Sequence, residues 1–453
     1  MGETRRRRRR RGLESLKSLL ILLLTLSAVY LTARVLIYNE LAEHLPQGWL
    51  GKVVSLFHRG EELESEPSRT DTPMTVAVYP VRIAVHGREE RFAVQYDTAG
   101  CDAVFEEVST LLGEALSGAD APEAVSEQEW QQALVAPGIW MDFPGEVPLE
   151  VLYAWLSQGG ANPALSATVR QLAVALDEDT GEVALYYHNE SNGLYYACRT
   201  QVRYEGHMDR VLEGYAGNNA SFAFELAGDA GYDALDPYVL ILSTTPAPQI
   251  YRSSNPLGSV DDALLDTLQQ AVSFRPQNNS VYPVANGIRV REGQETLLIG
   301  SDGTVVYDTA GDGAYRYPVQ EDGGTGLPGW LEATWSLASG TVGSYCGSAR
   351  LCLLGARSGD DGSLTVCYGY SLNGAAVVFP DGGCAAQFVI RNGQITDYTL
   401  RFRSYEETGK QSLVLPERQA AAALDALDPQ GRKLTLCYTD TGADTVQAAW
   451  EAG

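Results

Sequence analysis

This 453-residue chain has one long apolar run near its start. Elsewhere its apolar residues either alternate with polar ones or recur at helical spacing. Residues 18–33 contain no charged side chain, and the apolar character resumes at residues 35–38, after Arg34. Together these residues give about 21 positions, or about 30 Å of helix, which matches the hydrocarbon core of a bilayer. The pattern therefore predicts one transmembrane helix over residues 18–38, with the long side chain of Arg34 reaching the far interface.

A block of arginines precedes this run and sets its orientation. Such blocks resist translocation, so we expect residues 1–17 to be a cytoplasmic basic tail and the chain after Tyr38 to be exported. A cleaved signal peptide is the alternative, but the nearest match to a cleavage site, Leu31-Thr32-Ala33, lacks the A-x-A spacing. We therefore predict an uncleaved, single-pass anchor in the cell membrane. The residues that set this topology are Arg5, Arg6, Arg7, Arg8, Arg9, Arg10 and Arg11.

After a predicted juxtamembrane stalk at residues 39–72, period-two runs alternate with helix-spaced runs. The start of one helix is well marked, because Ser126 and Glu129 have the spacing of a capping box. The expected helices run from Asp102 to about Leu116, from Ser126 to about Val135, and onward from Pro148. The expected strands are 75–85, 91–97, 170–176, 182–188 and 193–204.

The second part of the chain repeats a helix followed by an antiparallel meander. The expected helices are one opened by Ser259-x-x-Asp262 that ends near Phe274, one over 328–337 that continues toward 344, and one over 416–427. The expected strands are 287–290, 295–299, 304–308, 351–356, 363–372, 375–379, 384–390, 394–405 (after an Asn392-Gly393 turn), 433–439 and 445–450.

These elements predict the α+β fold class: a single N-terminal transmembrane helix followed by extracytoplasmic antiparallel-sheet domains with covering helices. No parallel βαβ rhythm is visible, so doubly wound folds are disfavoured. We expect an N-terminal α+β domain at residues 73–250, a middle helix-meander module at 251–345 and a C-terminal α+β module at 346–453.

Charge narrows the range of partners. The whole chain has a formal net charge of −25, and residues 1–38 carry nine basic and two acidic side chains. The remaining 415 residues therefore carry about −32, which argues against nucleic acid as a partner and against direct adsorption to anionic lipid.

The polar residues form no catalytic or metal-binding pattern. The five histidines are scattered, and the sequence has no C-x-x-C, no G-x-S-x-G elbow and no phosphate loop. The seven cysteines are too sparse for a disulfide scaffold, and Cys346 with Cys352 is the local pair to test for a bridge. We predict a protein that is not an enzyme, with no catalytic residue, metal or cofactor. A cleft pairing Asp142 with a second carboxylate of raised pKa would contradict this prediction.

Several short segments match the pattern of a known family. They are the basic-start anchor Lys17–Tyr38, the stretch Ile139–Leu149 (IWMDFPGEVPL), Tyr368–Gly374 (YGYSLNG), the strand Gln387–Ile395 and the helix opening Leu415-Pro416-Glu417. This set resembles the YycH family, whose aromatic F-P-x-x-(I/V)-P stretch precedes a helix, and the C-terminal module is similar to the sister protein YycI. The seven-arginine tail and the cysteines depart from the family pattern.

The resemblance implies a regulatory function without active-site chemistry. The YycH and YycI proteins are single-pass regulators of the YycFG (WalKR) cell-wall two-component system of low-GC Gram-positive bacteria. The implied partners are the membrane, a sensor histidine kinase and a YycI-like sister protein, contacted through the transmembrane helix and the exported domains. An exported ligand- or polymer-binding protein is the alternative, and an envelope hydrolase is a less favoured one. The expected transmembrane contact face consists of Leu24, Ser27, Ala28 and Leu31.

Overall fold

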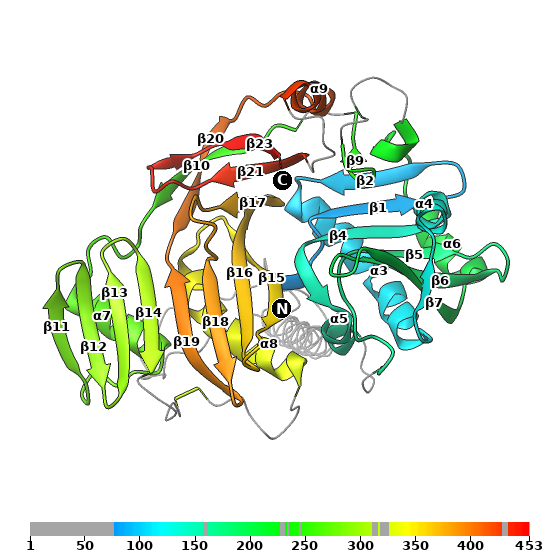
Figure 1. Cartoon of the computed structure of the whole chain (residues 1–453). Helices are drawn as coiled ribbons and strands as arrows, with labels where there is room; N and C mark the ends of the chain where they lie inside the picture. The colour runs from blue at the N-terminus through cyan, green and yellow to red at the C-terminus, as the bar shows by residue number, and fades with distance from the viewer. Residues whose placement is uncertain are drawn as a thin grey trace, which may run out of the picture. The chain divides into compact units, whose positions relative to one another are not determined.

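The computed structural model describes residues 77–156, 162–226, 232, 235–243, 246–309, 316–317, 326–427 and 434–452 (Figure 1). All of them belong to the compact unit Arg69–Gly453. The predicted basic tail, the anchor with its contact face, and the stalk lie outside the described residues. Among the helices of the described ranges, none combines the length and the apolar character that a membrane span requires.

The first part of the described chain forms a seven-stranded antiparallel sheet in the order β2-β1-β4-β5-β6-β7-β3. Side chains that alternate along its strands enter two different cores, so both faces of the sheet are covered. Ile83 and Met141 pack in the core that includes α3 and α5, whereas Ala84 and Trp140 pack against Trp130 of α4. The strands are β1 (Arg82–His86), β2 (Arg91–Gln95), β3 (Glu123–Val125), β4 (Gly138–Pro148), β5 (Thr168–Leu176), β6 (Glu182–Asn189) and β7 (Leu194–Arg203). The helices are α3 (Thr98–Ser117), α4 (Glu127–Val135), α5 (Leu149–Leu156) and α6 (Asp209–Leu212).

The helix starts test the predicted caps. The capping box at Ser126 is confirmed, since Ser126 and Glu129 bond each other's backbone N–H groups at the start of α4. The predicted start at Asp102 is wrong, because Asp97 caps α3 by accepting from the backbone N–H of Gly100 at 3.1 Å. Asp102 lies inside the helix, where its carboxylate is available for a distant partner.

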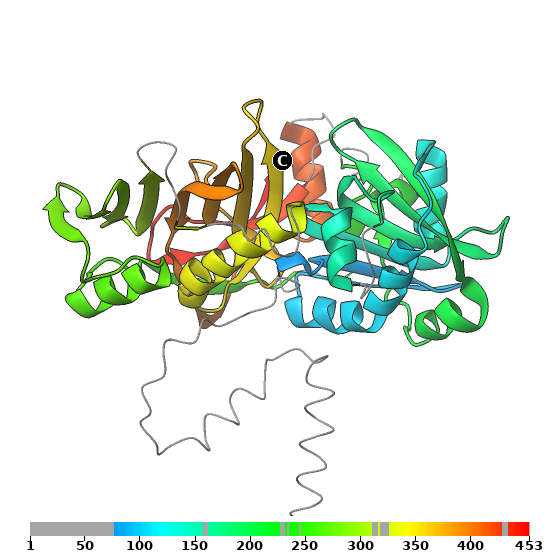
Figure 2. The same cartoon turned by 90° about the horizontal axis from the view of Figure 1, so that it is seen from below.

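The second part forms an eleven-stranded sheet in the order β11-β12-β13-β14-β19-β18-β16-β17-β21-β23, with β15 paired to the other side of β16. Its pairs are antiparallel except β17 with β21. The helices α7 (Asp262–Ala271) and α8 (Leu327–Ala338) supply core residues to one side of it (Figure 2). The strands are β11 (Ser280–Val284), β12 (Gly287–Glu292), β13 (Glu295–Gly300), β14 (Thr304–Thr309), β15 (Arg350–Ser358), β16 (Leu364–Leu372), β17 (Ala375–Val378), β18 (Ala386–Arg391), β19 (Gln394–Arg401), β21 (Leu434–Thr439) and β23 (Ala448–Ala452).

Residues 251–345 and 346–453 share this sheet, because β14 pairs with β19. The helix predicted to open at Ser259 instead begins after Asp261, whose side chain accepts from the N–H of Leu264 at 2.8 Å. Helix α8 continues into a π-helical turn at Ser339–Gly343, as the predicted continuation toward residue 344 suggested. Helix α9 spans Glu417–Leu427, close to its predicted bounds.

The strand predicted over residues 394–405 is divided between two sheets. It ends as β19 at Arg401 and resumes as β20 (Ser404–Gln411), which pairs with β10 (Gln249–Ser254) in a three-stranded sheet completed by β22 (Thr445–Val446). At the break, Arg403 is buried, and its guanidinium binds the carboxylate of Asp440 through two bonds of 2.7 and 2.9 Å. This pairing anchors the corner. The short strands β8 (Ser221–Phe222) and β9 (Leu240–Ile241) form a separate pair.

The predicted combination of antiparallel sheets with covering helices is confirmed in the described part of the chain. The structure does not test the proposed domain boundaries, which stay a prediction.

Candidate functional site

Asp142 lies in the middle of β4 and is completely buried. Arg82 is its register partner on β1, and Arg170 reaches it from β5 on the other side. The Nη1 of Arg82 donates to Oδ2 of Asp142 at 2.7 Å, and the Nε of Arg170 donates to Oδ1 at 3.2 Å. Each carboxylate oxygen therefore faces a guanidinium, which compensates for burying the charge.

A second acidic residue, Glu417, lies near the same arginine. Glu417 is the first residue of α9 and is 5 % exposed. Burial raises the pKa of Glu417 to about 7, although Arg82, the backbone N–H of Leu242 and the side chain of Gln95 act to lower it. Its Oε2 is buried and has no hydrogen-bond partner. Arg82 thus links an acid of the seven-stranded sheet electrostatically to an acid at the start of a C-terminal helix.

A cavity of about 190 Å³ lies beside this cluster. Gln95, Tyr96, Leu242, Asn373 and Tyr438 are among the residues that line it, whereas Asp142 and Glu417 are not. The hydroxyl of Tyr96 accepts from Arg82 and from the backbone N–H of Leu436, both at 3.4 Å. A general acid or base must come within hydrogen-bond reach of a substrate, and neither buried acid lines this cavity. The condition set for Asp142 is met in part: Glu417, an acid of raised pKa, lies near the same arginine, but neither acid lines this cavity.

Further polar contacts join the two large sheets. Arg350 of β15 makes a bidentate pair with Asp102 of α3, at 2.8 and 2.5 Å. Asn373 accepts from the N–H of Thr98 and donates to the carbonyl of Tyr96, both at 2.9 Å. Charge-assisted and bidentate bonds restrict geometry as well as adding energy. These contacts hold α3 and the residues just before it against β15 and the turn after β16.

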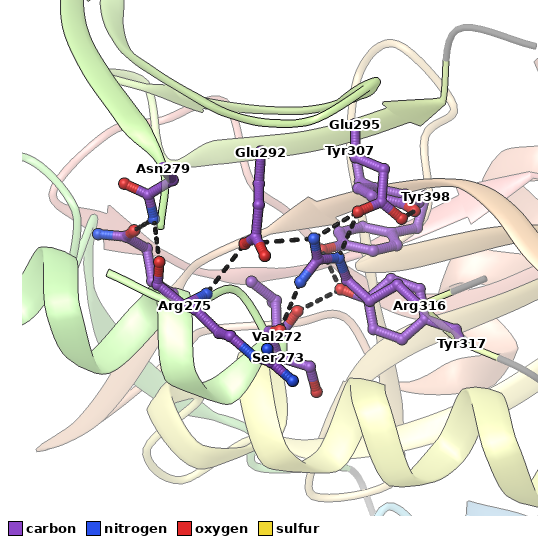
Figure 3. A network of polar contacts seen from close by, with 11 residues as sticks. Val272, Ser273, Arg275, Asn279, Glu292, Glu295, Tyr307, Arg316, Tyr317 and Tyr398 are labelled. Carbon is purple, nitrogen blue, oxygen red and sulfur yellow. Dashed lines mark hydrogen bonds and ion pairs between the residues drawn. The ribbon is translucent and has the colours of Figure 1, made fainter. Parts of the chain in front are cut away.

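A separate polar network surrounds Arg316 (Figure 3). The guanidinium of Arg316 binds Glu295 through Nε at 2.8 Å and lies 3.3 Å from Glu292. It also stacks over Phe274, with its central carbon 3.9 Å from the ring centroid. Glu292 in turn accepts from the backbone N–H of Arg275 at 3.0 Å. The network therefore fastens the segment after α7 to strands β12 and β13, which is a structural role.

Cys346 and Cys352 do not form the bridge that the sequence offered for testing. The thiol of Cys346 donates to the carbonyls of Gly343 and Ala349, both at 3.0 Å. The thiol of Cys352 donates to the carbonyl of Gly369 in β16. All seven cysteines are free thiols. Cys367 and Cys384 are half-buried, whereas the other five cysteines are buried. Within the described ranges, no three side chains of His, Cys, Asp or Glu are grouped to hold a metal ion.

Comparison with known proteins gives one informative match. No protein-family model and no curated protein matches the chain in sequence. The crystal structure of YycH from Bacillus subtilis matches it with probability 1.00 and a TM-score of 0.52, over 84 % of this chain and 94 % of that one, at 12 % sequence identity. The chain has the YycH fold. The likeness drawn from short sequence segments is therefore confirmed at the level of the fold.

The YycH-like segments take definite places in this fold. Ile139–Leu149 forms most of β4 and the first residue of α5, so it carries Asp142 into the centre of the sheet. Tyr368–Gly374 spans the end of β16 and the turn that contacts α3. Gln387–Ile395 covers most of β18, the turn after it and the start of β19, and Leu415–Glu417 precedes and opens α9. Two of these segments thus reach the Arg82 cluster, from the N-terminal and the C-terminal part. The similarity to YycI stays a prediction.

Proposed function

We propose that the protein is a membrane-anchored, extracytoplasmic regulator that modulates a cell-envelope sensor histidine kinase by protein–protein contact. The observation that carries this proposal is the YycH fold over 84 % of the chain, together with a sequence that begins with an arginine block and an apolar segment. The family that the segments resemble has this role.

The physical basis of such regulation is differential contact. A kinase with two conformations is biased by any partner that binds one of them more tightly. Anchoring both proteins in one membrane raises their effective concentration without a new contact. In lipid, helices associate through close approach of small residues, so the face of Leu24, Ser27, Ala28 and Leu31 is the proposed transmembrane contact.

The topology gives the first prediction. A secreted phosphatase reporter fused after residue 60 is expected to be active, because the arginine block keeps the N-terminus in the cytoplasm while the chain that follows is exported. Replacing Arg5–Arg11 by glutamine is the matched control and should reduce this activity. Activity of a cytoplasmic reporter alone would contradict the proposed orientation, and a mature chain beginning near Arg34 would indicate a cleaved signal.

The anchor face gives the second prediction. Ala28→Leu and Ser27→Leu are expected to weaken cross-linking to the kinase about fivefold, since about 1 kcal/mol of helix packing is lost. Ala33→Leu adds a bulky side chain at the opposite helical position and should leave cross-linking unchanged. Replacing residues 18–38 by an unrelated transmembrane helix should change kinase output, read from a cell-wall promoter.

Deletion of the gene separates regulation from the other roles. If kinase output under wall stress is the same with and without the gene, the regulatory proposal is wrong. A ligand- or polymer-binding role, or an envelope hydrolase, would then take its place.

A further inference from the structure

The cavity of about 190 Å³ beside the Arg82 cluster lies where the two large sheets meet. Gln95 lines it from β2 of the seven-stranded sheet, whereas Leu372 of β16 and Leu436 of β21 line it from the eleven-stranded sheet. Protein interiors leave few voids larger than a water molecule, and an apolar cavity of about 150 Å³ is large enough to bind benzene. The space at this junction is therefore that of a molecule with a single ring.

The cavity has an apolar floor and an opening to solvent. Leu372 and Leu436 are completely buried, whereas Ala247, between Pro246 and Pro248, is exposed. None of the described residues that line the cavity carries a formal charge. A charged ligand would give up its hydration there without meeting an opposite charge in the lining, so the cavity favours an uncharged ligand.

Two tyrosines of the lining supply hydrogen-bonding groups. The hydroxyl of Tyr438 donates to the carbonyl of Gln249 at 2.8 Å, so its oxygen is left to accept. The hydroxyl of Tyr96 accepts from Arg82 and from the N–H of Leu436, so it keeps its own proton to donate. A ligand hydroxyl matches this pair, because it accepts from one tyrosine and donates to the other.

Tyr96 has an unusual backbone conformation. Its φ is 55°, in the left-handed region that a bulky residue rarely adopts. Asn373, which also lines the cavity, donates to the carbonyl of Tyr96 and accepts from the N–H of Thr98, both at 2.9 Å. Strained conformations of this kind are concentrated at ligand and active sites, where surrounding contacts maintain them. Strain, space and hydrogen-bonding groups therefore coincide at this cavity.

We propose that the cavity binds an uncharged phenol ring. The ring occupies the space above the buried leucines, and its hydroxyl bonds Tyr96 and Tyr438. A bound ring contacts both large sheets at once, so it stabilises their junction. A free small phenol and the tyrosine side chain of a peptide share this chemistry. The site goes beyond the proposed kinase contact, and the purified chain by itself is enough to test it.

The experiment titrates p-cresol into the full-length chain in detergent, with isotope-labelled alanine methyl groups observed by NMR. Ala375 lines the cavity and is 3 % exposed, so its methyl group reports binding at this place. We expect its resonance to shift saturably, with a Kd of about 1 mM or below for so small a ligand. Benzoate, a charged ring of similar size, should leave it in place. Binding of p-cresol without N-acetyl-tyrosinamide identifies a free phenol as the ligand, and binding of both identifies the side chain of a peptide.

Three variants separate the cavity from other sites. Ala247→Phe places a ring at the opening and should weaken binding about tenfold or more. Ala376→Phe is the matched control, because Ala376 is exposed on β17 and does not line the cavity, and it should leave binding unchanged. Tyr96→Phe should weaken binding of p-cresol about fivefold without affecting toluene, since only the donated hydrogen bond is lost.

Circular dichroism checks that each variant is folded. Uptake of p-cresol by detergent is the same for all variants and cancels between them. The proposal is overturned if the Ala375 methyl resonance does not move, if benzoate shifts it as p-cresol does, or if Ala247→Phe binds p-cresol as tightly as the wild type.

Discussion

Asp142→Ala is expected to lower the free energy of unfolding by about 3–5 kcal/mol, because it leaves two arginines without their shared buried counter-charge. Arg82 and Arg170 both bond the carboxylate, whose side chain is 1 % exposed. Neither guanidinium can give up its proton, and their neighbouring strands hold them in place. Urea unfolding of the full chain, followed by tryptophan fluorescence, measures the loss. Trp140, two residues away in β4, is well placed to report it.

A matched exposed pair provides the control. Glu123 lies 3.8 Å from Arg199, and both side chains are 71 % exposed. Glu123→Ala should change the free energy of unfolding by about 1 kcal/mol or less, because water screens such pairs. Asp142→Asn keeps the shape but turns an amide N–H₂ group toward a guanidinium, so we expect it to be destabilising as well. If Asp142→Ala lowers the free energy of unfolding as little as Glu123→Ala does, Asp142 does not stabilise the packing of β1, β4 and β5.

Glu417→Gln is expected to make the protein more stable than the wild type at pH 8, by up to about 3 kcal/mol, and about equally stable at pH 4. Burial raises the pKa of Glu417 from 4.5 to about 7 in the folded protein. The folded state therefore binds a proton more tightly than the unfolded state. The stability that the protonated form contributes is fully present below about pH 4.5 and is lost as the pH rises through about 7. Glutamine is neutral at every pH, so the variant does not lose this stability as the pH rises.

The measurement is the difference in free energy of unfolding between variant and wild type across this pH range. Other titrating groups are present in both proteins and cancel; one of them is His86, where burial lowers the pKa to about 4. Glu406→Gln is the control, because Glu406 is 65 % exposed and pairs only loosely with Arg252, at 3.3 Å. A difference for Glu417→Gln that stays constant from pH 4 to pH 8 would show that this carboxyl is not forced toward neutrality.

The sequence by itself determined the features that depend on interactions between neighbouring residues. The capping box at Ser126 and the turn at Asn392-Gly393 were both predictable, and the turn residues do have positive φ values of 50° and 70°. Such features depend on neighbouring residues, which the sequence shows directly. Alternating runs likewise predicted strands such as β16 and β18, and from these the α+β class followed.

Only the tertiary structure decided which residues distant in sequence contact each other. Residues 138–148 form the interior strand β4, whose first six residues are all buried, so this part lacks the alternation that marks a strand. At the break between β19 and β20, Arg403 binds Asp440, a residue that lies far from it in the sequence. The approach of Glu417 to Arg82 depends on the same kind of long-range packing. Sequence patterns report forces between near neighbours, whereas contacts between distant residues exist only once the sheets have assembled.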